Sequence, residues 1–181
     1  STDDAPISPT NTVIRRQSNY GSADIQPVSV GNVTLFVQRA KRKLRELVFD
    51  FNTDSYSAPD MTILAEHITE SGIRTITYQQ EPDNVVWAVL NNGKLCGMTY
   101  RREEEVVAWH NHDIAGSFTG VHAINSPTSQ TYDYGIVESV AVLPSELDED
   151  DLFIIVKRTI GGTTKRFIER FNFFDFGANI L

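Results

Sequence analysis

The chain has 181 residues, a net charge of -8 and a single cysteine. This acidic balance argues against general binding to nucleic acid or anionic membranes, whose phosphates would be repelled. One cysteine, Cys96, excludes an internal disulfide framework and a cysteine-rich zinc site. The sequence has neither an apolar run of the roughly 20 residues that a membrane span needs nor an N-terminal signal segment. Because it begins with Ser1, we expect it to be a piece of a longer protein.

The first part of the sequence predicts an arm followed by a hairpin. Residues 1–24 are rich in turn-forming residues, which favours an extended arm or linker. The stretches Val33–Gln38 and Lys43–Phe51 have strand composition and are joined by the basic turn Arg39–Arg42. They predict two antiparallel strands, and Ile25–Val30 is a candidate for a further strand before them.

A short helix is predicted over residues 61–70. Asp60 is suited to be its N-cap, and Gly72 stands where a left-handed C-terminal stop belongs. Apolar residues recur at helical spacing between them. A helix of about ten residues needs tertiary packing to persist, so we expect it to lie against the sheets.

A second hairpin is the strongest local prediction in the sequence. The apolar run Val85–Leu90 is followed by Asn92 and Gly93 and then by a second strand that begins at Leu95. Asn-Gly between two such runs favours a tight hairpin, because both central turn residues need positive φ. The stretch Ile73–Gln79 predicts a strand before this hairpin.

The last part of the sequence repeats this arrangement. Residues 111–135 form a stretch that is long for a connection, and they predict an insertion or contact loop with a short strand near Phe118. The strand candidate Val137–Leu143 follows, and then Leu152–Ile160 and Thr163–Phe171 predict a third hairpin around two glycines.

These three units resemble one another and predict an all-β, mainly antiparallel fold. Units of about 40–50 residues with three or four strands are the signature of β-propeller blades. We therefore expect β-propeller-like blades with one short helix over residues 25–176, and a short tail over residues 177–181. A propeller usually needs about 4–8 blades. The two alternatives are that this chain is part of a larger propeller-containing protein or that the units form a smaller open assembly.

His110 and His112 are the most tempting candidates for a metal site. If Val106–His112 is a strand, the two histidines at positions i and i+2 point to one face. A metal would need a further ligand, for which Asp113 or His67 is a candidate. The alternative interpretation is a strand that ends in polar residues at a loop, and we expect no metal, cofactor or catalytic residue.

Charged and aromatic clusters offer further candidates. The acidic runs Glu103–Glu105 and Glu146–Asp151 resemble solvated turns more than catalytic carboxylates, which must be held across a cleft. The basic residues of the first hairpin are Arg39, Lys41, Arg42, Lys43 and Arg45. Alternate residues of a hairpin face opposite sides, so we do not expect these side chains to form one continuous patch for an acidic partner. Trp87 and Trp109 lie in apolar runs and are interpreted as core.

Several motifs in conserved order resemble a family of phage and prophage tail proteins. They are Tyr20–Gly31 with Leu35–Arg39, Ala58–Ile68, Gln80–Val89, Met98–His110 and Val137–Val142. The chain is similar over about residues 15–171 to the central region of the tail-nozzle, or tail-hub, proteins of short-tailed phages. Members of that family are several times longer than this chain.

The resemblance implies a structural virion protein with no catalysis. Nozzle proteins contain β-propellers and assemble as a hexameric ring beneath the portal and adaptor, next to tail fibres or tailspikes. They form the end of the DNA exit channel and hold packaged DNA until infection, without sequence-specific binding. The alternative is a propeller-type module that binds a host receptor or glycan through Trp109, His110, His112 and the 111–135 loop.

Overall fold

The computed structural model describes residues 8–10, 12, 16, 18–52, 54–122, 128–145 and 149–171. These residues form 13 strands in four antiparallel sheets, with no helix among them. The predicted all-β, antiparallel class is therefore confirmed. The predicted tail over residues 177–181 lies outside the described residues.

Three meandering sheets and one small hairpin make up the fold. Sheet A consists of β1 (Val28–Val30), β2 (Val33–Val37), β3 (Leu44–Asp50) and β4 (Ser55–Ser57). Sheet B consists of β5 (Ile73–Gln79), β6 (Val85–Leu90), β7 (Leu95–Arg101) and β8 (Val106–His112). Sheet C consists of β11 (Ile136–Pro144), β12 (Asp150–Ile160) and β13 (Thr163–Phe171). The separate hairpin pairs β9 (Phe118–Gly120) with β10 (Gln130–Tyr132).

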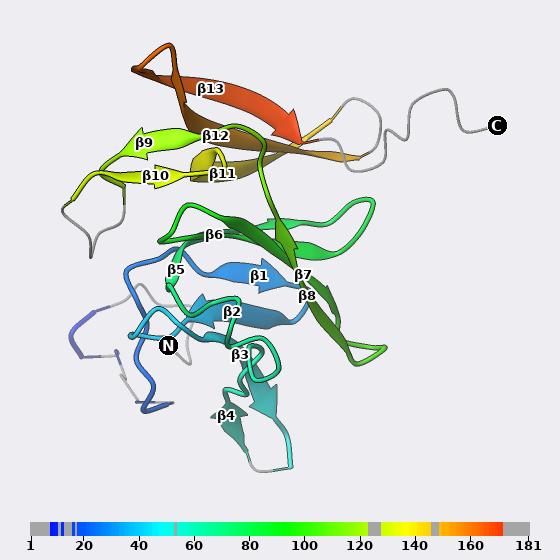
Figure 1. The fold of residues 1–181 in the computed structure, drawn as a ribbon. Coiled ribbons are helices and arrows are strands. Elements are labelled where there is room, and N and C mark those ends of the chain that lie inside the picture. Colours follow the sequence, from blue (N-terminus) through cyan, green and yellow to red (C-terminus); the bar gives the residue numbers. More distant parts are fainter. Residues whose placement is uncertain are drawn as a thin grey trace.

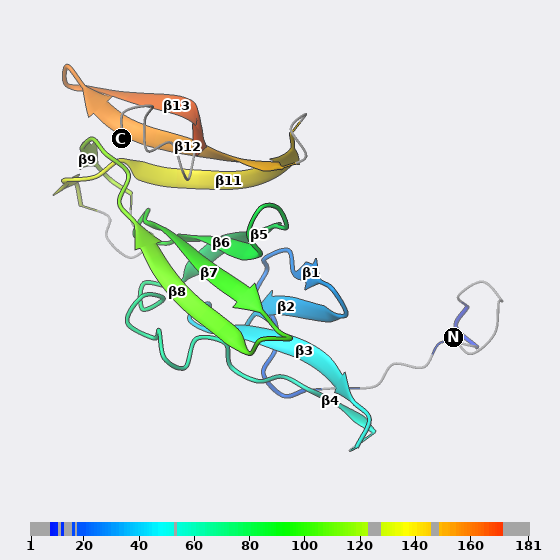
Figure 2. The ribbon, with the colours of Figure 1, turned by 90° about the vertical axis from the view of Figure 1, so that its right-hand side faces the viewer.

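The three sheets are layered in chain order. Figures 1 and 2 show sheet B, in green, between sheet A, in blue and cyan, and sheet C, in yellow to red. One apolar core lies between sheets A and B, and a second lies between sheets B and C. The first strands of the three sheets, β1, β5 and β11, lie close together, and β5 contacts both of the others.

The middle position of sheet B explains the apolar sequence of β6. All six residues of this strand are buried. Val86, Ala88 and Leu90 belong to the core facing sheet A, while Val85, Trp87 and Val89 belong to the core facing sheet C. A strand covered on both faces needs a continuous apolar run, because alternate residues point to opposite sides.

The predicted hairpins are confirmed by the pairing of their strands. Val89 faces Leu95 across the Asn92-Gly93 turn, and Ile160 faces Thr163 across Gly161 and Gly162. Gly161 and Gly162 both have positive φ, as a two-residue turn matched to the strand twist requires. In the other hairpin Gly93 has positive φ but Asn92 does not, because the Leu90 N–H donates to the Lys94 carbonyl and closes a three-residue loop. The three preceding strands also form, as β1, β5 and β11.

The helix predicted over residues 61–70 is wrong, because this segment forms a series of turns. The helical spacing misled the prediction, since Ile63 and Leu64 are 70% and 90% exposed. Thr62 and Thr69 are buried instead, and the Thr69 hydroxyl donates to the Arg42 carbonyl at 2.8 Å. Local bonds to side chains compete with a helical ladder and here hold the segment against sheet A.

Backbone hydrogen bonds also tie the layers together at their ends. The Ile73 N–H donates to the Lys41 carbonyl at 2.6 Å and joins β5 to the turn of sheet A. The Val137 N–H donates to the Gly93 carbonyl at 2.8 Å and joins β11 to the turn of sheet B. The described residues thus form an open stack of sheets, and a closed propeller stays a proposal.

Candidate interaction surfaces

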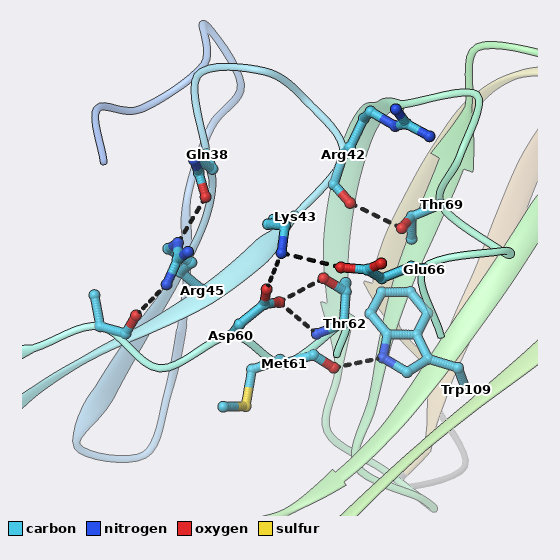
Figure 3. A network of polar contacts seen from close by, with 11 residues as sticks. Gln38, Arg42, Lys43, Arg45, Asp60, Met61, Thr62, Glu66, Thr69 and Trp109 are labelled. Carbon is cyan, nitrogen blue, oxygen red and sulfur yellow. Dashed lines mark hydrogen bonds and ion pairs between the residues drawn. The ribbon is translucent and has the colours of Figure 1, made fainter. Parts of the chain in front are cut away.

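The basic cluster of the first hairpin is divided between several internal partners. The Lys43 ammonium lies 2.7 Å from the Asp60 carboxylate and 3.1 Å from that of Glu66. Asp60 also accepts a hydrogen bond from the Thr62 N–H at 2.9 Å, as Figure 3 shows. Burial alone would raise the pKa of Asp60, but the hydrogen bonds from Lys43 and Thr62 outweigh it and lower the pKa.

Arg45 is taken up inside the fold as well. Its side chain is buried and donates to the Gln38 side chain at 2.7 Å and to the Ala58 carbonyl at 2.6 Å (Figure 3). The Tyr20 ring covers the guanidinium at 3.5 Å. Lys43 and Arg45 therefore connect parts of this chain, which leaves the turn residues Arg39, Lys41 and Arg42 on the surface.

A groove of about 560 Å³ lies between sheets A and B. Its polar groups bind one another: the Tyr78 hydroxyl donates to the Asn84 side chain at 2.5 Å. The Tyr100 hydroxyl and the Arg102 guanidinium both donate to the buried Glu46 carboxylate, at 2.6 and 2.9 Å. Burial and the bond to Glu46 raise the pKa of Tyr100. This arrangement joins two sheets.

His110 and His112 do share one face of β8, as the sequence predicts. His110 Nδ1 lies 2.7 Å from His112 Nε2, and both rings contact the indole of Trp87. Burial lowers the pKa of both histidines, that of His112 to about 4. Asp113 binds Lys94 at 3.1 Å, and no group of three metal-ligating side chains occurs within the described residues. The pair therefore packs between sheets B and C, where Phe171 contacts His112.

Trp109 is engaged in the same way. Its indole N–H donates to the Met61 carbonyl at 2.8 Å, and its ring packs against the core between sheets A and B (Figure 3). The rings of Trp109, His110 and His112 thus contribute to packing, as the interpretation of Trp109 as core predicted. Cys96 is buried too, and burial raises the pKa of its thiol to about 12.

The acidic runs divide into an exposed turn and a structural link. Glu103, Glu104 and Glu105 are exposed in the turn between β7 and β8. Asp150, however, accepts the N–H groups of Gln80 and Glu81 at 2.8 and 3.0 Å and joins sheet C to sheet B. Residues 146–148 of the second predicted run lie outside the described residues.

The two end faces of the stack carry exposed apolar side chains that the sequence reading missed. On β12, Leu152, Ile154 and Val156 enter the core, so Phe153 and Ile155 point to the outer face of sheet C. Ile168 lies opposite Ile155 on the same face and is 77% exposed. The sequence does carry a sign of this surface, because β12 is apolar at consecutive positions and therefore on both of its faces.

At the other end of the stack, the outer face of sheet A carries an aromatic cluster. Phe49 lies opposite Tyr56 in the pairing of β3 with β4, and their rings meet edge to face at 5.2 Å. Phe51 contacts Phe49 at 5.0 Å and is 88% exposed. Exposed apolar groups gathered in this way mark surfaces that associate with other molecules.

No family model matches the chain, and no curated protein matches it. Within the described residues, no helix is long and apolar enough to cross a membrane. A functional assignment therefore depends on the residues and surfaces described above.

Proposed function

We propose that this chain is part of a structural virion protein of a phage tail, a subunit of the nozzle or hub ring that forms the DNA exit channel and retains packaged DNA. The observation that carries the proposal is the stack of three antiparallel meanders with an exposed apolar face at each end. A protein built in this way is suited to assembly. The sequence motifs that resemble tail-nozzle proteins supply the specific role.

The internal construction supports a mechanical role. The most distinctive polar clusters, at Lys43, Glu46 and Asp150, join one part of the fold to another. Such links stiffen the layers against one another, as a wall that contains packaged DNA requires. The net charge of -8 fits this role, because an acidic wall repels the duplex and lets it slide.

The proposed partners follow from the same role. The protein would contact further copies of itself in a ring, the adaptor or portal above it, and tail fibres or tailspikes beside it. DNA would pass through the ring without sequence-specific binding. We assign it no catalytic activity and no cofactor, and we place it in the virion.

The test is the state of the intact native polypeptide in solution. Light scattering should give a mass of several subunits, about six for a hexamer, and electron microscopy should show closed rings with a central channel. The intact mass of one subunit, measured in parallel, should exceed the 20.3 kDa of these 181 residues. A stable monomer of 20.3 kDa would overturn the proposal.

A further inference from the structure

Sheet C has the composition of a layer covered on both faces, but on its outer face Phe118 and His122 cover Lys157 and leave Ile168 77% exposed. The central strand β12 is apolar at consecutive positions from Leu152 to Val156, as β6 is along its whole length. In β6 this pattern corresponds to a sheet on either side. On β12 only one parity is in the core, and Phe153 and Ile155 face outward beside the exposed Ile168.

The outer face of sheet A offers a matching surface at the opposite end of the stack. Tyr20 already covers Arg45 on this face, so the free part lies toward the turn between β3 and β4. There Phe49, Phe51 and Tyr56 form the aromatic cluster. Figures 1 and 2 place this turn at the far end of the stack from sheet C.

The charges beside the two surfaces are complementary. Arg166 and Arg170 alternate with Ile168 on β13, and their side chains remain 60% and 55% exposed although they pair with Glu138 and Asp151. Asp54 lies in the β3–β4 turn, close in sequence to Phe51 and Tyr56 of the aromatic cluster. Opposite charges at the rim of an apolar contact fix its register and favour the correct partner.

We propose that the outer face of sheet C in one copy docks onto the outer face of sheet A in the next copy. Such a contact uses two different surfaces and therefore continues from copy to copy, and it forms a ring when the rotation between copies closes. The inference rests on the proposed function as an assembly protein, and it names the surfaces that the assembly uses. The interface continues between copies the sheet-on-sheet packing found within each chain.

The test uses two variants that each block one face. Ile168→Asp places a charge on the outer face of sheet C, and Phe51→Asp places one in the aromatic cluster of sheet A. Both residues are exposed, so the variants should keep the circular dichroism spectrum of the native chain. Each variant alone should be monomeric by light scattering, whereas a one-to-one mixture should form a dimer, because one intact interface remains. The control Leu64→Asp, on an exposed residue outside both faces, should assemble like the native chain.

A pair of charge variants provides a second, independent measurement. Arg170→Glu and Asp54→Arg should each raise the dissociation constant of the assembly about tenfold through like-charge repulsion, and the double variant should restore it. A monomeric native chain, or blocked variants that assemble as the native chain does, would overturn the inference. Closed rings that persist in both blocked variants would overturn these surfaces and leave the proposed function intact. Open chains of subunits sensitive to both variants would support the surfaces and contradict the ring.

Discussion

His110 Nδ1 and His112 Nε2 lie 2.7 Å apart on one face of β8, and the two rings meet edge to face. A hydrogen bond between two imidazoles needs an N–H on one ring and a lone pair on the other, so at least one ring must be neutral. Burial lowers the pKa of His110, and burial together with the neighbouring His110 lowers that of His112 to about 4. The pair is therefore neutral in the folded protein at pH 7.

This relationship predicts that acid destabilises the fold. In the unfolded chain both histidines return to a pKa near 6.5. Between pH 6.5 and 4 the unfolded state then binds more protons than the folded state, so the stability present above pH 6.5 falls as the pH drops. The melting temperature should decrease over this window, measured by circular dichroism between pH 7.5 and 4.

The variant His112→Gln tests whether the histidine pair causes this dependence on pH. It should reduce the dependence of the melting temperature on pH, while His67→Gln, on an exposed side chain, should leave it unchanged. Part of the dependence should remain, because burial and the nearby Lys157 also lower the pKa of His122. An unchanged pH dependence in His112→Gln would show that the pair does not contribute.

Gly97 provides the space that the His110 ring occupies. The two residues face each other in the pairing of β7 with β8, and a Cβ on Gly97 would overlap the imidazole, with Nε2 at 2.8 Å. The ring cannot move freely, since Trp87 and His112 hold it. Gly97→Ala should therefore lower the free energy of unfolding by about 1–3 kcal/mol in a urea titration. The double variant Gly97→Ala/His110→Ala should lose little more than His110→Ala alone; a fully additive loss would contradict this explanation.

Strands and turns were predictable here because each has a local cause. The β5 bounds, Ile73–Gln79, agree with those read from the sequence, and the glycine-containing turns define the hairpins on β6 and β12. The same local rules failed over residues 61–70. There the candidate caps were present, but Ile63 and Leu64 stay exposed while Met61 and Ile68 pack against the core, and turns with buried threonines formed instead of a helix.

The candidate surfaces depend on contacts that are distant in sequence, and these were harder to predict. The sequence placed His110 and His112 on one face, but it gave no sign that Trp87 and Phe171 pack against them. Asp150 appeared to be one of several solvated acidic residues, because its partners, just after β5, lie about 70 positions earlier. Which face of β12 is covered by sheet B follows only from the order in which the sheets are layered.

The carboxylate of Asp60 should stabilise the segment that replaces the predicted helix. It accepts bonds from the N–H and the hydroxyl of Thr62, at 2.9 and 2.5 Å, besides its ion pair with Lys43. Asp60→Ala should therefore lower the free energy of unfolding by about 1–3 kcal/mol in a urea titration, because Thr62 is left buried without these acceptors. Glu66→Gln, at the exposed end of the same network, should change it by less than about 1 kcal/mol. If the free energy of unfolding fell by less than about 1 kcal/mol in both variants, water would be able to replace the carboxylate of Asp60.

Gln79 connects the core tryptophan of sheet B to the first strand residue of β12. Its side-chain oxygen accepts the Trp87 indole N–H at 2.9 Å, and its side-chain nitrogen donates to the Asp150 carbonyl at 2.6 Å. Gln79 is 4% exposed, so water cannot readily replace either bond. Gln79→Leu should cost about 1–3 kcal/mol of unfolding free energy for the buried Trp87 N–H left unpaired.

The variants at position 79 separate the two bonds. Gln79→Glu keeps an acceptor for Trp87 but turns a carboxylate oxygen toward the Asp150 carbonyl, so it should loosen sheet C while leaving the indole bond in place. Amide hydrogen exchange should then increase at the start of β12 in Gln79→Glu, whereas the fluorescence of Trp87 should change chiefly in Gln79→Leu. Gln80→Leu is the matched control, because its side chain is exposed and its backbone N–H still reaches Asp150. If Gln79→Leu unfolded at the same urea concentration as Gln80→Leu, this link would contribute nothing, and sheets B and C would be held by their apolar core alone.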